Sequence, residues 1–254
     1  MRLYHPAIIE MNNQFNVHQL CGREITQDEV HIWSASLDRP ESRFQELLSQ
    51  DERDRAGRFI FERDRTQYIV RQGILRILLG NYLGIEPGLV RINYGKNDKP
   101  VLADIYDSTE MHFNLSHSEG LAIYAFTGDR EIGIDIEQIR DIPDMEQIFE
   151  RFFSPRENEV FHILPENRRK EAFFNCWTRK EAFIKATGDG LSMPLDKFDV
   201  SLVPDEPARL LRIEENTEEA SRWSIQDLKP ASGFAAAVAM KGQISNIDCR
   251  RWVE

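Results

Sequence analysis

The spacing of apolar and polar residues divides the first half of the chain into short strands and two helical stretches. Residues 30–37 alternate and are rich in β-forming residues, which predicts a strand. Residues 39–59 repeat with helical spacing, and Pro40 stands where a first-turn proline would. Residues 63–84 have a broad apolar side and predict a longer helix that ends at Gly84. Further strands are expected at 89–94, 100–103 and 111–116.

The second half has a similar mixture of elements. The segment GLAIYAFTGDREIGIDIEQI contains two β-rich runs joined by the turn-like TGDRE, which predicts a hairpin. Helices are expected at 145–151, 155–163 and 167–187, and strands at 198–203, 208–213, 222–228, 233–240 and 243–253. Each half therefore combines strands with one long helix. This pattern predicts an α+β fold class, either as one domain or as a duplicated α+β unit.

Composition limits the function classes. The 254 residues are 41% hydrophobic, which fits a globular chain with a real core. No run approaches the ~18 apolar residues of a transmembrane helix, and no signal peptide is evident, so we expect no membrane partner. Three distant cysteines without a CxxC pair favour a reducing, cytoplasmic setting. The net charge of −11 argues against nucleic acid as a partner.

Two local basic zones contrast with this acidic balance. Residues 52–76 carry seven arginines against four acidic residues, and residues 166–185 carry six basic residues against three acidic ones. Each zone is consistent with a solvated helix face, or with a phosphorylated ligand or acidic partner.

A pair of carboxylates lies in the run EIGIDIE. In a strand, its three isoleucines would point into a core, and Asp135 and Glu137 would share the other face, roughly 7 Å apart. Two like charges so close repel unless a cation lies between them, and Mg²⁺ prefers such oxygen ligands. The alternative is a solvated strand face with two acids.

A third carboxylate lies in the helical segment WTRKEAFIKATGDGL. On a helical wheel, Phe173, Trp177 and Ile184 form an apolar stripe, and Glu181 falls inside it, about 40° from Trp177. A carboxylate buried there needs a partner or a metal. The alternative is a simple i,i+4 ion pair with Lys185.

The segment FNLSHSEG supplies a cluster of polar side chains at the end of a predicted strand, including Asn114, Ser116, His117 and Ser118. Hydroxyl and imidazole groups of this kind can bind phosphate oxygens, although a polar turn without a ligand has the same composition.

Taken together and in order, FNLSHS, GIDIE, FFSPRENEVF and WTRKEAFIKATGDGL resemble the motifs of the 4′-phosphopantetheinyl transferases. The chain is similar to their larger, surfactin-synthetase-activating type, in the variant with Trp and KEA. This resemblance implies a pseudo-twofold pair of similar α+β halves, each a long helix on a small antiparallel sheet. Residues 1–125 would form the N-terminal half, with coenzyme A contacts and a carrier-binding rim. Residues 126–254 would form the C-terminal half, with the metal-binding acids.

The resemblance also implies an activity and a site. Members transfer the phosphopantetheine arm of coenzyme A to a serine of an apo acyl, peptidyl or polyketide carrier protein, with Mg²⁺ or alternatively Mn²⁺ as cofactor. A monomer would suffice, since the site lies between the two halves of one chain. The implied metal ligands are Asp135, Glu137 and Glu181, with Asp135, Glu181 and Lys185 as catalytic residues. The implied coenzyme A contacts are Arg55, Lys99, Ser116, His117, Asp135 and Lys185.

One departure concerns the phosphate contacts, because Asp98 stands before Lys99 where the family often has glycine. The basic zone at residues 168–180 and the segment RFFSPRENEVF (residues 151–161) are a candidate surface for an acidic carrier protein. Two other functions remain open for the same residues: a Mg²⁺-dependent hydrolase of a nucleotide pyrophosphate, and a non-catalytic interaction protein.

Overall fold

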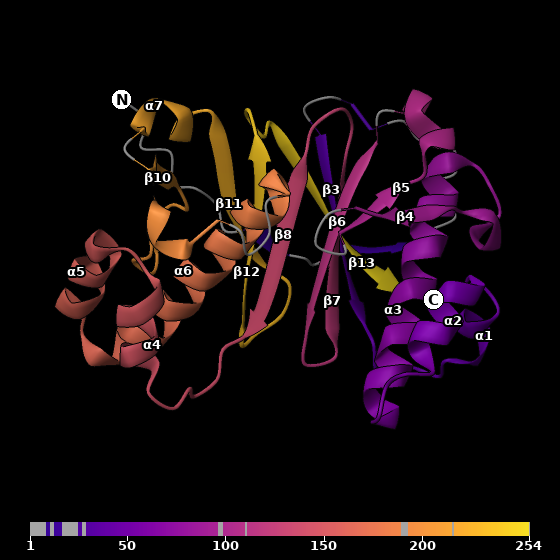
Figure 1. The fold of residues 1–254 in the computed structure, drawn as a ribbon, viewed down its shortest axis with the longest axis horizontal. Helices are drawn as coiled ribbons and strands as arrows, with labels where there is room; N and C mark the ends of the chain where they lie inside the picture. Colours follow the sequence, from indigo (N-terminus) through magenta and orange to yellow (C-terminus); the bar gives the residue numbers. More distant parts are fainter. Residues whose placement is uncertain are drawn as a thin grey trace.

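The structure, a computed structural model, describes residues 9–10, 13–16, 25–26, 29–95, 99–109, 111–188, 193–214 and 216–253. Within these residues two β-sheets share an inner core, and a long helix covers the outer face of each sheet (Figure 1). The expected α+β fold, with two halves that each place a long helix on a sheet, is therefore confirmed.

The first sheet contains five strands and carries the helices of the first half. Its strands, in spatial order, are β2 (Asn13–Asn16), β13 (Asn246–Val253), β3 (Glu29–Ser36), β7 (Leu121–Thr127) and β6 (His112–Ser118). The long helix α3 (Glu62–Leu83) packs on this sheet through a common core. Gly84 ends α3 as predicted, since its φ of 67° is a conformation that glycine adopts without strain. Strands β4 (Ile92–Tyr94) and β5 (Pro100–Leu102) form a separate hairpin.

The single helix expected over residues 39–59 is wrong. Two short helices, α1 (Ser42–Gln45) and α2 (Gln50–Ala56), replace it, because Ser49 starts a new helix. The Ser49 hydroxyl accepts a hydrogen bond from the Glu52 amide, and the Glu52 carboxylate accepts one from the Ser49 amide. Glu52 is buried and also accepts a hydrogen bond from Arg76 Nε at 2.7 Å, which ties α2 to α3.

The second sheet contains four strands and carries the helices of the second half. Its order is β1 (Ile9–Glu10), β11 (Trp223–Lys229), β12 (Phe234–Lys241) and β8 (Ile132–Gln138). The long helix α6 (Glu166–Thr187) covers it, next to α4 (Met145–Phe152) and α5 (Pro155–Ile163), as expected from periodicity. Strands β9 (Phe198–Val200) and β10 (Leu210–Ile213) pair beside α7 (Thr217–Ala220). Short 3₁₀ turns occupy Pro87–Leu89, Asp104–Thr109 and Leu195–Lys197.

The predicted hairpin between residues 121 and 138 is wrong. Strand β7 pairs with β3 and β6, whereas β8 pairs with β12, so the intervening turn passes from one sheet to the other. Strand β8 lies beside β6 instead, and the two sheets meet along this line. Local sequence cannot reveal the distant strand that completes the ladder of β8.

Each end of the chain contributes a strand to the sheet of the opposite half. Strand β13 pairs in parallel with β3 and β2, and β1 pairs in parallel with β11. The sheets are therefore mixed rather than purely antiparallel. The boundary expected after residue 125 falls within β7. The division into residues 1–125 and 126–254 stays a prediction. The two sheets do not follow it, because β13 pairs within the first sheet and β1 within the second.

Candidate functional site

The alternation expected in β8 separates a core face from a face that meets α6. Ile132, Ile134 and Ile136 enter the inner core between the sheets. Gly133, on the other face, lies against the backbone of α6: an added Cβ would be 2.1 Å from Ala182 O and 2.3 Å from Ala186 N. Because glycine permits this contact, α6 packs directly over β8. Asp135, next on that face, is only 4% exposed, so the alternative of a solvated strand face is wrong.

Strand β6 contributes the polar side chains that bridge to β8. Asn114 Oδ1 accepts a hydrogen bond from the Ile134 amide at 2.9 Å, and Ser118 Oγ accepts one from the Gln138 amide at 3.1 Å. These side chains take the place of a neighbouring strand along the edge of β8. The Ser118 hydroxyl also donates to Glu137 Oε2 at 3.1 Å, so β6 positions one of the candidate acids.

Lys185, on the last turn of α6, reaches across to this line. Its Nζ lies 2.7 Å from Asp135 Oδ1 and 3.0 Å from Ser116 Oγ, and the Ser116 hydroxyl donates to the same carboxylate oxygen at 2.9 Å. The ion pair of Lys185 is thus formed with Asp135 and not with Glu181 as in the i,i+4 alternative. Lys99 Nζ donates to the Lys185 carbonyl at 2.6 Å, which places a second cation at the same helix end.

Electrostatic interactions link the three predicted acids. Burial, followed by the negative charge of Asp135, raises the pKa of both Glu137 and Glu181, and Lys185 opposes this shift. Asp135 Oδ2 is buried and has no hydrogen-bond partner within the described residues. An unpartnered buried carboxylate oxygen next to two acids with raised pKa values fits a hard divalent cation, which prefers oxygen ligands. The role of the three acids as ligands stays a prediction, because they do not form a group of three with all ligand atoms within 4.8 Å of one another.

The apolar stripe that the helical wheel predicted is present on α6. Phe173 and Ile184 are buried, and the ring of Trp177 stacks on Phe173 with centroids 6.1 Å apart. Phe153, just beyond α4, packs its ring edge-on against Trp177. The predicted stripe is confirmed, and Glu181, on the same helix, is close enough to Asp135 for that charge to raise its pKa.

Replacing Glu181 by Gln should raise the melting temperature of the metal-free protein by a few degrees at pH 7. The pKa of Glu181 is higher in the folded than in the unfolded protein. The free energy of unfolding therefore falls as pH rises from the unfolded-state pKa through the folded-state pKa. At neutral pH the ionised carboxylate thus destabilises the fold. Thermal melts with a chelator measure the effect, with exposed Glu159→Gln as control. A lower melting temperature for Glu181→Gln would contradict this electrostatic account.

A pocket of about 250 Å³ adjoins the acids and contains most of the predicted phosphate contacts. Arg55, Ser116, His117 and Lys185 line it, together with Tyr68, Arg71, Gln72, Tyr94, Pro100 and Leu115. Lys185 and Ser116 also touch Asp135, so pocket and acids are continuous.

Positive charge and unpartnered hydrogen-bond donors in the pocket favour binding of an anion. Arg71 Nε and Tyr68 Oη are buried without hydrogen-bond partners within the described residues. Partial burial, followed by the charges of Arg71 and Lys185, lowers the pKa of His117, although much of this side chain is open to solvent. Burial lowers the pKa of Arg71 as well. A bound anion would supply the missing partners and relieve the repulsion among these cations.

Sequence reasoning did not assign Arg71, Tyr68 and Tyr94 to this site. Tyr68, Arg71 and Gln72 are spaced i, i+3 and i+4 on α3, so they share one helix face. That spacing and the arginine-rich run at 52–76 were visible signals. Only the packing of α3 beside β6 shows that this face lines a pocket rather than a core.

The proposed basic surface at residues 168–180 requires correction. Arg179 and Lys180 are fully buried, where Arg179 pairs with Asp227 and Lys180 lies 2.9 Å from Glu157. The other three basic side chains pair with acidic residues of the same chain: Arg168 with Asp205, Arg169 with Glu146, and Lys170 with Asp141. The positive charge counted in the sequence is thus largely neutralised internally.

No helix within the described ranges is long and apolar enough to cross a membrane.

Comparison with known proteins covers both halves. Residues 131–239 match the profile of the 4′-phosphopantetheinyl transferase superfamily, and residues 32–127 match that of the 4′-phosphopantetheinyl transferase N-terminal region. The chain is 44% identical to 4′-phosphopantetheinyl transferase HetI of Nostoc sp. (strain PCC 7120), over 86% of this chain and 90% of that protein.

More distant relatives carry related names. Identity is 32% to 4′-phosphopantetheinyl transferase Sfp of Bacillus subtilis (strain 168), over 69% of this chain and 78% of Sfp. It is 28% to the human L-aminoadipate-semialdehyde dehydrogenase-phosphopantetheinyl transferase, over 76% of this chain and 67% of that protein. With both regions matched and an extended relative above 30% identity, the chain belongs to the 4′-phosphopantetheinyl transferase family.

Proposed function

We propose that this protein uses the seam between β6 and β8 to transfer the phosphopantetheine arm of coenzyme A to a serine of an apo carrier protein. The observation that carries this proposal is the continuity between the cationic pocket and the acids, with Lys185 touching both. Residues of the first half would hold the coenzyme A phosphates, and residues of the second half would hold the cation. The pocket and the acids are assembled from both halves of the chain, so we expect a monomer to be active.

Asp135, Glu137 and Glu181 are the residues that would hold Mg²⁺. When bound there, Mg²⁺ would neutralise the coenzyme A pyrophosphate and increase the electrophilicity of its phosphorus. The unpartnered Asp135 Oδ2 and the raised pKa of Glu137 and Glu181 support this assignment. Manganese offers the same oxygen preference, so we expect it to substitute.

The chain's own residues provide positioning and charge, which is what phosphoryl-type transfer requires. The serine oxygen of the carrier bonds to the phosphorus that bears the arm, and the bond from that phosphorus to the bridging oxygen breaks. The electron pair leaves with adenosine 3′,5′-bisphosphate, where Lys185 can donate a hydrogen bond to the departing oxygen. The serine proton goes to Glu181 or to a metal-ligated water, either of which would lie within hydrogen-bond reach.

The decisive experiment follows the arm. The protein is incubated with coenzyme A and Mg²⁺, with and without an apo carrier, and free 4′-phosphopantetheine and arm-bearing carrier are quantified by liquid chromatography and mass spectrometry. Transfer predicts arm-bearing carrier and little free arm. Free arm released without carrier would indicate the hydrolase alternative, and neither product with several carrier types would contradict the transferase assignment.

Arg71 provides a sharper test of the pocket. Replacing Arg71 by Ala should raise KM for coenzyme A at least tenfold, since a hydrogen bond to a charged group contributes about 1.5–3 kcal/mol. Arg71→Lys should recover only part of the loss, because lysine keeps the charge but not the Nε donor. Steady-state kinetics at saturating carrier measure this effect. Exposed Arg58→Ala is the control, and an equal KM for the Arg71 and Arg58 variants would exclude Arg71 from the pocket's function.

The carrier-binding rim is proposed at the start of α3. Ile60 and Phe61 are 91% and 68% exposed, and neighbouring Phe59 packs on Tyr68, a pocket residue, with ring centroids 5.3 Å apart. Exposed apolar residues this close together mark interaction surfaces. A carrier seated here would present its serine near the pocket.

Replacing Ile60 and Phe61 together by Ser should raise KM for the carrier severalfold and leave KM for coenzyme A unchanged. The matched control is Ile163→Ser, an 83% exposed isoleucine at the end of α5. If the control variant loses carrier affinity and the double variant does not, the dock lies on the second half instead. Charge reversal at Arg168, Arg169 and Lys170 is a poorer test, because it would also break internal ion pairs.

A further inference from the structure

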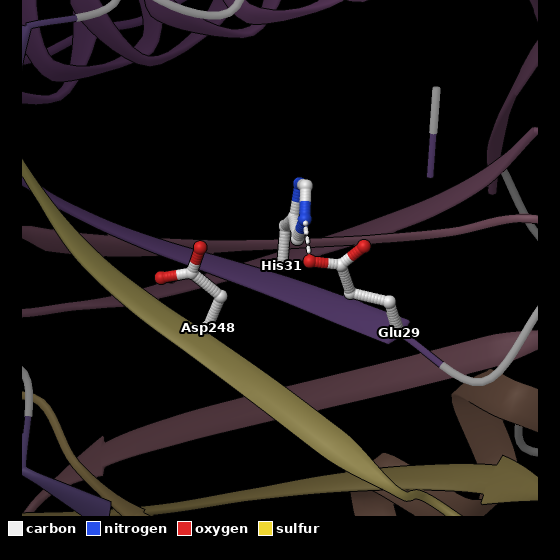
Figure 2. A group of neighbouring side chains, drawn as sticks. All are labelled: Glu29, His31 and Asp248. Atoms are coloured by element: carbon white, nitrogen blue, oxygen red, sulfur yellow. Dashed lines mark ion pairs between the residues drawn. The ribbon is translucent and has the colours of Figure 1, made fainter. Parts of the chain in front are cut away.

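A second group of potential metal ligands lies away from the pocket, where β3 and β13 run side by side. Glu29 and His31 are two residues apart on β3 and share a face, and Asp248 is the direct partner of His31 on β13. One ligand atom from each residue lies within 4.8 Å of the other two. Figure 2 shows the His31 ring between the two carboxylates. None of the three lines the pocket described above.

A contact at Nδ1 fixes the orientation of the His31 ring. Its Nδ1 lies 2.7 Å from the Tyr82 hydroxyl, which also accepts a hydrogen bond from Trp33 Nε1 at 3.1 Å. This contact turns Nε2 toward the carboxylates. Metal-ligating histidines are commonly oriented in this way, through the ring nitrogen that does not bind the metal.

His31 Nε2 and the Glu29 carboxylate lie close enough together, in a buried position, to bind one cation. His31 is fully buried, and its Nε2 has no hydrogen-bond partner in the described part of the chain. Glu29 Oε1 lies 3.0 Å from Nε2. Two ligand atoms at about 2.1 Å from one tetrahedral cation are about 3.4 Å apart, so this pair has to open by only a few tenths of an ångström to share one.

The charge balance leaves room for a cation. Two carboxylates face the imidazole, and burial lowers the pKa of His31, which favours the neutral form that binds metals. Arg250 is the neighbouring positive side chain, and both of its bonds to Asp248, from Nε and Nη2, go to Oδ2. A carboxylate oxygen of Asp248 also lies within 4.8 Å of the ligand atoms of Glu29 and His31.

We propose that Glu29, His31 and Asp248 bind one divalent cation of the zinc class, separate from the catalytic acids. One imidazole nitrogen and two carboxylate oxygens suit zinc better than Mg²⁺, which takes oxygen ligands. The site joins the last strand of the chain to β3, in a sheet assembled from both ends of the sequence. Its effect is to stabilise that sheet without entering the transfer reaction.

Zinc titration of the chelator-treated full chain tests this proposal, by calorimetry in excess Mg²⁺. The background is Asp135→Asn, which weakens the catalytic acids as a competing site. We expect one zinc ion per chain in this background, and at least tenfold weaker binding when Asp248→Asn is added. Zinc should raise the melting temperature of Asp135→Asn but not of the variant that carries both Asp135→Asn and Asp248→Asn. Asp248→Asn alone, with a partly exposed side chain, should keep full transfer activity.

Absence of zinc binding in the Asp135→Asn background, or equal binding with and without Asp248→Asn, would overturn the proposal. Zinc-edge absorption spectroscopy of the unaltered protein gives a readout that needs no variant. We expect a first shell with one imidazole and oxygen atoms, and a shell of oxygen alone, or one containing sulfur, would place the zinc elsewhere.

Discussion

Replacing Asp135 by Asn is expected to reduce kcat/KM for arm transfer by about a thousandfold, in line with the loss of a charged group that acts directly on a transition state. The substitution preserves volume but removes the charge that pairs with Lys185 at 2.7 Å. It also replaces the carboxylate whose buried Oδ2 lacks a partner. Both the cation and the orientation of Lys185 should therefore be lost together.

The control for this variant is Asp104→Asn, an exposed aspartate in a 3₁₀ turn. Circular dichroism should give both variants the spectrum of the unaltered protein, so that the loss is assigned to chemistry. Added Mg²⁺ up to millimolar levels should not restore the Asp135 variant. Retention of more than a tenth of the activity by Asp135→Asn would exclude a direct role for this carboxylate.

Replacing Gly133 by Ala is expected to cost about 1–3 kcal/mol in the free energy of unfolding, as overpacking does in well-packed cores. The new methyl group would lie 2.1 Å from Ala182 O, 2.3 Å from Ala186 N and 2.8 Å from Lys185 C. These are backbone atoms, so α6 itself must move. Because α6 carries Glu181 and Lys185, transfer activity should fall at least tenfold in the fraction that remains folded.

Urea unfolding and steady-state kinetics measure the two effects of Gly133→Ala. Gly88→Ala is the matched control, since an added Cβ there meets nothing within 4 Å. An unchanged midpoint and unchanged activity for Gly133→Ala would show that α6 does not rest on β8 at this glycine.

The placement of the candidate acids on their strand and helix depends on local periodicity. Alternation along residues 131–137 placed Asp135 and Glu137 on one strand face, and the helical wheel placed Glu181 within the aromatic stripe of α6. Both patterns are confirmed, because burial of one face determines the direction of its neighbours. The distances between elements, such as that from Lys185 to Asp135, are not contained in either pattern.

The predictions that failed depend on contacts between distant residues. The hairpin at 121–138 was wrong because β8 pairs with β12, about a hundred residues later in the chain. Counting charges gave a basic surface at 168–180, but tertiary partners bury Arg179 and Lys180. Arg71 was counted only as one of the arginines of residues 52–76, because its unpartnered Nε appears only once α3 is packed beside β6.

Anomalous diffraction from crystals grown with Mn²⁺ and coenzyme A tests the central claim most directly, because it locates the cation itself. We predict a manganese peak bonded to carboxylate oxygens of Asp135, Glu137 and Glu181 and to the coenzyme A pyrophosphate, with adjoining phosphate in contact with Arg71 and Lys185. A peak that lacks these carboxylates, or coenzyme A bound outside the pocket between α3 and β6, would contradict the account.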